Sequence, residues 1–165
     1  MPIVLFRVDE RLIHGQVVVG WGAQLHPERI VVVDDELADS KWEQELYTLG
    51  LPSDLEAEFE PVSRARDLID EWRRSPRRTL ILTRDISTMR RLGEGGLLRE
   101  EEVNIGGIHF APGRDAVLPY VFLSSEERAE LRKLAADGAV IQARDLPGSR
   151  RVELADLLDE GGASG

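Results

Sequence analysis

Residues 30–35 read IVVVDD, a run of apolar, mostly β-branched residues that stops at two carboxylates. A short run that is apolar on both faces is typical of a strand buried in a parallel sheet with helices on each side. Residues 2–7, PIVLFR, have the same character. Amphipathic stretches follow both runs, and this alternation indicates βαβ units around a mostly parallel sheet.

The alternation continues along the rest of the chain. Strands are predicted at about 2–7, 30–35, 56–62, 79–83, 103–107 and 140–146. Helices are predicted at about 14–25, 36–50, 63–74, 86–93, 125–137 and 152–158. The fifth helix begins with a capping signature that places Ser124 or Ser125 at its N-cap. Residues 108–119 read as irregular and residues 120–123 as a short apolar run, so we expect one α/β domain over residues 1–160 and a frayed tail at 161–165.

The composition excludes several classes of protein. The chain has 165 residues, 42% of them hydrophobic, which suits one compact domain. Its formal net charge of −10 would repel a nucleic-acid backbone, so we expect no nucleic-acid partner. The absence of cysteine removes thiolate chemistry and Cys-ligated metal sites. No apolar run approaches the roughly 20 residues of a membrane helix, and no signal peptide is evident, so a cytoplasmic protein is expected.

The loop after the first strand, residues 7–16, reads RVDERLIHGQ. This loop is the first candidate for a ligand site, because ligands of open α/β sheets bind beyond the carboxyl ends of the strands. Two arginines, one aspartate and one histidine fall within eight positions: Arg7, Asp9, Arg11 and His14. Gly15 and Gln16 follow in the first turn of the predicted helix.

These residues favour a phosphate site with an imidazole inside it. The helix start presents unpaired backbone N–H groups to an anion, here around Gly15 and Gln16. Arginines add forked, charge-assisted donors. A neutral imidazole has a lone pair that can attack phosphorus, and phosphoryl transfer needs little beyond positioning and charge neutralisation. Asp9 could hold an arginine in place or accept a hydrogen bond from the other ring nitrogen of His14.

The same residues also admit a structural interpretation. A histidine near a helix start often caps or packs, and an Arg-Asp-Arg run is often a solvated cluster of ion pairs. The physics of the loop alone does not choose between the two interpretations.

A family resemblance favours the functional one. Residues 7–17, RVDERLIHGQV, resemble the active-site signature of the IIB components of the mannose-family (mannose/fructose/sorbose) phosphotransferase system. Further blocks resemble that family in the same order, so the likeness covers nearly the whole chain: IVVVDDELA at 30–38, VNIGGIHF at 103–110, YVFLSSEE at 120–127 and IQARDLP at 141–147.

The resemblance implies a mechanism for these residues. His14 would accept a phosphoryl group, at its Nδ1 atom, from a phosphohistidine of a IIA component. It would pass the group to a sugar bound at the membrane-embedded IIC and IID components. Arg11, with Arg7 in support, would neutralise the charge in transit, and Asp9 would orient the arginines.

The resemblance also implies a doubly wound, mostly parallel sheet with one antiparallel edge strand, and neither a metal nor a cofactor. The chain reads as a free-standing IIB, so its donor would be a separate polypeptide or domain. A homodimer is a reasonable expectation, while the identity of the sugar is not readable from the chain.

Other residues carry open alternatives. Thr83 could offer its hydroxyl or backbone N–H to phosphoryl oxygens, or be satisfied locally. Gly106 and Gly107 could permit a close approach of the backbone or simply form a turn. Asp34 and Asp35 could shape the rim of the site, although solvated turn carboxylates are the favoured interpretation.

The remaining histidines and the tryptophans are read as structural. His26, before a proline, is expected in a surface loop, and His109 is expected to have a structural role. Packing in the core or in an interface is the default for the three tryptophans, Trp21, Trp42 and Trp72.

Three functions compete. The leading one is a phosphotransferase that carries phosphate toward a sugar during uptake. The second is a regulatory phosphoprotein in which phosphorylated His14 controls a partner rather than feeding transport. The third is a non-catalytic domain that binds a sugar or phosphate, which a phosphorylated IIA would leave unlabelled.

Overall fold

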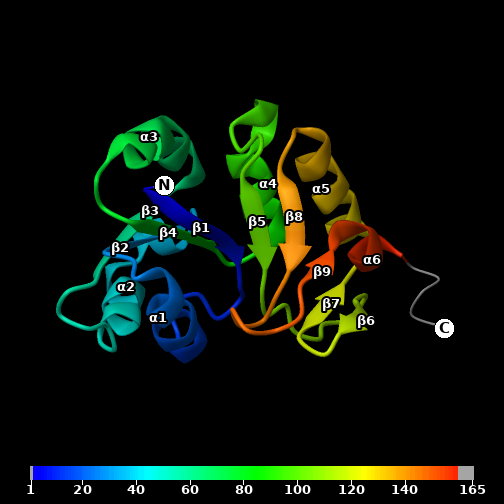
Figure 1. Cartoon of the computed structure of the whole chain (residues 1–165), viewed down its shortest axis with the longest axis horizontal. Coiled ribbons are helices and arrows are strands. Elements are labelled where there is room, and N and C mark those ends of the chain that lie inside the picture. The colour runs from blue at the N-terminus through cyan, green and yellow to red at the C-terminus, as the bar shows by residue number, and fades with distance from the viewer. Residues whose placement is uncertain (1, 160–165) are drawn as a thin grey trace.

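The computed structural model describes residues 2–159, which form a three-layer α/β domain (Figure 1). Seven strands form the main sheet in the order β3-β2-β4-β1-β5-β8-β9, and two form a separate hairpin, β6-β7. Their bounds are β1 (Ile3–Val8), β2 (Arg29–Val33), β3 (Glu56–Glu60), β4 (Thr79–Thr83), β5 (Glu102–Ile105), β6 (Asp115–Leu118), β7 (Val121–Leu123), β8 (Val140–Ala143) and β9 (Val152–Glu153).

The helices lie on both faces of the main sheet. They are the π-helical η1 (Gln16–Trp21), α1 (Gly22–Leu25), the 3₁₀ turn η2 (Leu37–Asp39), α2 (Lys41–Thr48), α3 (Val62–Arg74), α4 (Ile86–Leu92), the 3₁₀ turn η3 (Glu94–Gly96), α5 (Ser125–Ala136) and α6 (Leu154–Leu158). All strand pairs of the main sheet are parallel except β8–β9, which is antiparallel. The predicted doubly wound fold with one antiparallel edge strand is therefore confirmed.

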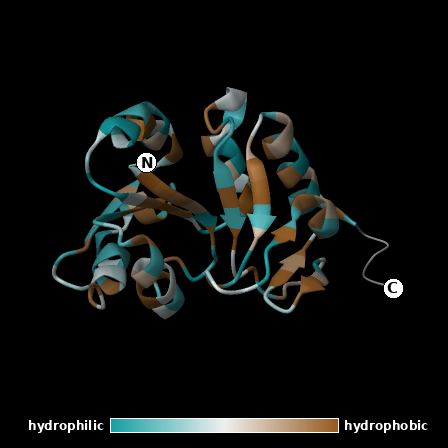
Figure 2. Cartoon of the chain, viewed as in Figure 1, coloured by the Kyte–Doolittle hydropathy of each residue, from teal (hydrophilic) through white to brown (hydrophobic). Residues whose placement is uncertain are grey.

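Two apolar clusters flank the sheet, because the buried strands expose apolar side chains to both faces. On one face, Ile30 and Val32 of β2 pack with residues of η1 and η2, including Val17 and Leu37. On the other face, the second cluster joins β2, β4 and β1 to α3, α4 and α5. In the hydropathy colouring, β1 and most of β8 are apolar, whereas α3 carries both polar and apolar residues (Figure 2). The buried apolar strand predicted from IVVVDD is confirmed as β2, in which Ile30–Val33 are buried.

Several boundaries differ from the predictions. The helix predicted at 14–25 begins as a π-helical segment at Gln16, and the helix predicted at 36–50 divides at Ser40 into η2 and α2. The strand predicted at 140–146 ends at Ala143. The start of the helix predicted at 152–158 is instead the edge strand β9.

The stretch read as irregular, 108–119, contains strand β6, which pairs antiparallel with β7. The predicted domain end at 160 and the tail at 161–165 lie outside the described residues. No helix within residues 2–159 is long and apolar enough to cross a membrane.

Candidate functional site

The candidate site is built on the loop that leaves β1, at the carboxyl edge of the sheet. β1 lies between β4 and β5, while the chain leaves it toward β2 on the far side of β4. The backbone N–H of Asp9 donates to Thr83 O at the end of β4 (3.0 Å), and that of Glu10 donates to Gly107 O after β5 (2.9 Å). The loop is thus fixed at a point where the strand order reverses, which is where ligands of such sheets bind.

Asp9 is the centre of the site. Its carboxylate is fully buried and accepts hydrogen bonds from Arg7 Nη2 (3.0 Å), from Arg11 Nε and Nη2 (3.2 Å each) and from the Arg11 backbone N–H (3.1 Å). Burial by itself raises the pKa of Asp9, but the hydrogen bonds from Arg11 and the charge of Arg7 outweigh it and leave the pKa below its usual value. Asp9 therefore holds both arginines, as one of its two predicted roles required.

The Nη atoms of Arg7 are occupied by acceptors of the protein itself. The Arg7 side chain is fully buried, and its Nη atoms donate to the side chains of Asn104 and Asp9 and to the backbone oxygens of Arg144 and Asp145. The Trp21 ring lies 5.3 Å from the guanidinium carbon. Burial lowers the pKa of Arg7, and Asp9 partly offsets the effect. Arg7 therefore holds Asp9, which in turn holds Arg11, and its expected support in neutralising the phosphoryl charge stays a prediction.

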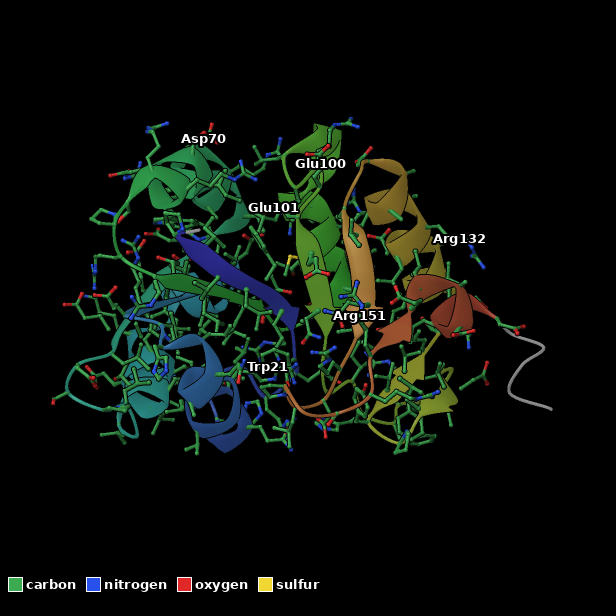
Figure 3. The ribbon with its side chains drawn as sticks, viewed as in Figure 1. Trp21, Asp70, Glu100, Glu101, Arg132 and Arg151 are labelled. Atoms are coloured by element: carbon green, nitrogen blue, oxygen red, sulfur yellow. The ribbon has the colours of Figure 1, made fainter. Side chains whose placement is uncertain are left out.

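Trp21 also ties the helix after the loop to the far side of the site. Its Nε1 donates to Asp145 O at 3.1 Å, so η1 is fastened to the loop that leaves β8. Figure 3 shows this side chain between the two segments.

Arg11 is the arginine that remains accessible. Its side chain is 35% exposed, and its fork already contacts both oxygens of Asp9. Nη2 also donates to Gln16 Oε1 at 2.6 Å, so Gln16 fixes the guanidinium from the helix side. Arg11 is therefore a pre-oriented cation at the mouth of the loop.

His14 lies beside this pair. Its side chain is 16% exposed, its Nδ1 lies 2.7 Å from Leu12 O, and its Nε2 lies 3.7 Å from Asp9 Oδ2. Because a carbonyl oxygen only accepts, Nδ1 carries the proton of that hydrogen bond, and the lone pair of the neutral ring is on Nε2. Leu12 has a left-handed backbone, with φ 55°. Nε2 itself has no hydrogen-bond partner in the described part of the chain.

The start of η1 offers backbone donors next to the ring. The amides of Val17 and Val18 both donate to His14 O, at 3.1 and 2.9 Å. Within residues 2–159, the amides of Gly15 and Gln16 meet no protein acceptor. The amides predicted to meet an anion therefore have no acceptor in this part of the chain. A Cβ added at Gly15 would meet no atom within 4 Å.

Thr83 is satisfied locally rather than aimed at the site. It is fully buried, and its hydroxyl donates to Asp85 O at 3.0 Å. Its carbonyl oxygen accepts the hydrogen bond from the backbone N–H of Asp9. Of the two alternatives left open for Thr83, the local one therefore describes its hydroxyl, whose proton is already used, while its carbonyl holds the loop.

Gly106 and Gly107 permit a close approach. A Cβ at Gly106 would overlap the Arg7 guanidinium, and one at Gly107 would lie 3.1 Å from Arg11 Nη2 and 3.3 Å from Asp9 Oδ1. Both glycines leave room for the arginines, so the close-approach interpretation holds over a plain turn.

The other titratable candidates lie outside this group. Asp34 is buried and caps η2 through Leu37 N, contrary to the solvated carboxylate expected there. Asp35 accepts from Val62 N and from Arg91. His26 is exposed, as expected. The side chain of His109 is 57% exposed, and its backbone N–H donates a hydrogen bond to Glu10 Oε1.

Sequence reasoning missed the polar residues beneath Arg7. Asn104 of β5 accepts from Arg7 and donates to Gln142 of β8 at 3.1 Å, and all three side chains are buried. Both amides occupy positions in short strands that otherwise read as apolar, which is the signal that could have revealed them.

The family model of the PTS system sorbose subfamily IIB component matches residues 3–164. The mannose-specific EIIAB component of Escherichia coli K12 is 29% identical over 160 residues, which cover 97% of this chain and 49% of that protein. The chain therefore spans about half the length of the mannose-specific relatives it matches.

Two proteins of similar length also match. The N-acetylgalactosamine-specific phosphotransferase enzyme IIB component 1 of E. coli K12 is 29% identical, covering 93% of this chain and 97% of that protein. The crystal structure of an N-acetyl-galactosamine IIB component from Streptococcus pyogenes superposes with a TM-score of 0.83 at 30% identity, covering 93% of this chain and 96% of that one.

Proposed function

Because the chain belongs to the sorbose-subfamily IIB components of the phosphotransferase system, we propose that it is a cytoplasmic carrier that receives a phosphoryl group on His14 and delivers it to a sugar. The donor is a phosphohistidine of a IIA component, and the sugar is bound by IIC and IID membrane components. The observation that supports His14 is its ring beside the Asp9–Arg11 pair, at the point where the strand order reverses.

The transfer exchanges one N–P bond for another. A lone pair on the His14 ring attacks phosphorus, the N–P bond of the donor phosphohistidine breaks, and the donor ring keeps its electron pair. Open amides at Gly15 and Gln16 and the guanidinium of Arg11 face the phosphoryl oxygens. Such donors neutralise the charge that a loose transition state spreads over those oxygens.

The ring must change its protonation for attack by Nδ1, the atom implied by the family resemblance. Nδ1 donates to Leu12 O in this structure, so that hydrogen bond opens and the ring proton moves to Nε2. Asp9 Oδ2, 3.7 Å from Nε2, is placed to accept a hydrogen bond from that proton. The carboxylate thus stabilises the tautomer whose lone pair is on Nδ1.

Reconstitution of the transport system tests the proposal. Membrane vesicles that contain IIC and IID, supplied with phosphorylated IIA, are expected to phosphorylate sugar when the wild-type chain is added. His14→Ala should abolish sugar phosphorylation, whereas His26→Ala should not. Sugar phosphorylation that persists with His14→Ala would overturn the proposal.

A further inference from the structure

The helix α2 exposes apolar side chains instead of burying them. None of its residues is fully buried. Trp42, Leu46 and Leu49 follow one another at intervals of four and three, so they share one helix face, and their exposed fractions are 65%, 57% and 81%. Scattered apolar residues are ordinary on a surface, but a contiguous set is typical of an interaction site.

The stripe continues onto η1, the helix that starts beside His14. Val19 of η1 is 70% exposed. Val19 and Leu46 line the same hollow of about 290 Å³, whose wall also includes Ile13, His14 and Gly15. Helices α1 and α2 run on the same side of the sheet (Figure 1). We call Val19, Trp42, Leu46 and Leu49 the apolar ridge.

We propose that the apolar ridge is the docking surface for the IIA phosphodonor, an inference that rests on the proposed carrier function. Four of the six large, exposed hydrophobic side chains in the described chain belong to the ridge, and the hollow that it borders contains the reactive histidine. A donor whose phosphohistidine reaches His14 has to cover this hollow. The donor therefore presents an apolar surface around its phosphohistidine. One of the donor's side chains packs beside Leu46.

The chemistry of transfer favours an apolar contact at this place. Water that reaches phosphorus competes with the imidazole, and closing the site with apolar groups removes that water. A tryptophan at the end of the ridge supplies a large contact area of the kind that dominates binding energy in interfaces. The polar donors of the site then act in a medium of low dielectric constant, where they are more effective.

A second copy of this chain fits the ridge less well. Each copy has a net charge of −10, which opposes self-association. A stable dimer through the ridge would also cover the hollow and shut His14 away from any donor. The occupant must leave after each transfer, as a donor protein does.

The test compares a protein donor with a small one. Leu46→Glu and Trp42→Ala are labelled either by the phosphorylated IIA protein of the same organism or by phosphoramidate, which needs no docking surface. Val140→Glu is the matched control, because Val140 is an exposed valine on β8 outside the hollow. Thermal melting checks that each variant folds.

We expect labelling of Leu46→Glu by limiting IIA to be about tenfold slower and to recover at high IIA concentration, which corresponds to about 1.4 kcal/mol of binding. Labelling by phosphoramidate, and both reactions of Val140→Glu, should match the wild type. Unchanged rates with both donors would overturn the docking surface and leave the carrier function standing. A wild-type chain that neither donor labels would overturn the carrier function itself. A wild-type dimer that Leu46→Glu dissociates, measured by sedimentation, would assign the ridge to self-association instead.

Discussion

Asp9 Oδ2 lies 3.7 Å from Nε2 of His14, and the carboxylate that faces the ring is itself held by two arginines. The aspartate therefore connects the buried interior to the loop that carries His14. Arg7 reaches it from below and Arg11 from the solvent side, so one carboxylate holds both arginines and faces the imidazole, whose Nδ1 is held by Leu12 O.

Asp9→Asn is expected to destabilise the fold by about 3–5 kcal/mol at pH 7, because it leaves the buried Arg7 without its charged partner. The pKa of Asp9 is lowered in the folded chain, so its stabilising effect is present above the unfolded value of about 3.9 and is lost as pH falls through the folded value. The difference between variant and wild type should therefore shrink toward pH 3. Urea unfolding at several pH values measures it.

Asp70→Asn serves as the control for that experiment. Asp70 pairs with Arg73 at the surface and is 65% exposed, so its loss should change stability by no more than about 0.5 kcal/mol. Equal effects of the two substitutions at pH 7 would contradict the role assigned to Asp9.

Arg11→Ala should slow phosphoryl transfer more than Arg11→Lys. Lysine keeps the charge but cannot contact both oxygens of Asp9 as the guanidinium does. The transfer rate of Arg11→Lys should therefore still be lower than that of the wild type. We expect losses of about tenfold for lysine and about 100-fold for alanine, in line with the loss of a donor to a developing anion. Quenched-reaction kinetics with phosphorylated IIA measure the rates. Equal rates for the two variants would show that the forked geometry of the guanidinium does not contribute to transfer.

Gly106→Ala should destabilise the chain and reduce transfer together. A methyl group there overlaps the guanidinium of Arg7, which is buried and fixed by four partners. Overpacking of this kind costs about 1–3 kcal/mol. Gly148→Ala is the control, since nothing lies within 4 Å of a Cβ at that position. If Gly106→Ala melted at the wild-type temperature, the arginine would be more mobile than its contacts indicate.

Glu58→Gln should stabilise the protein at neutral and alkaline pH but not near pH 4. Burial, with the neighbouring Glu60, raises the pKa of Glu58 to about 7, so its charged form disfavours the fold. Stability should fall as pH rises from the unfolded value of about 4.3 through that pKa. Because the group is half-buried, we expect a gain of only about 1 kcal/mol at pH 8 after solvent screening, and none near pH 4. Melting curves at both pH values measure the difference, with the exposed Glu45→Gln as a control.

Much of the fold could be predicted because its signals are local. The apolar run at 30–33 forms a buried strand, β2, and the capping signature at Ser124 is present as a reciprocal contact with Glu127. The hairpin at 115–123 was missed because its strands are short and its turn contains Pro119 rather than the Asn-Gly or Asp-Gly pair of tight hairpins.

The site was predicted in part. Spacing in the chain placed His14, Asp9 and Arg11 on one loop, and their contacts follow from that. It could not show that Arg7, two residues before Asp9, points into the interior, since that depends on Asn104 and on the loop after β8, distant in sequence. The exposure of Trp42 could not be predicted either, because helical periodicity does not tell which apolar helix face other elements cover.

The central claim is that His14 carries the phosphoryl group, and an intact-mass measurement tests it most directly. After mixing with phosphorylated IIA, the wild-type chain should gain one acid-labile phosphoryl group that maps to the peptide containing His14, and His14→Ala should gain none. An adduct on His26 or His109, or a His14→Ala chain labelled as fully as the wild type, would contradict the account.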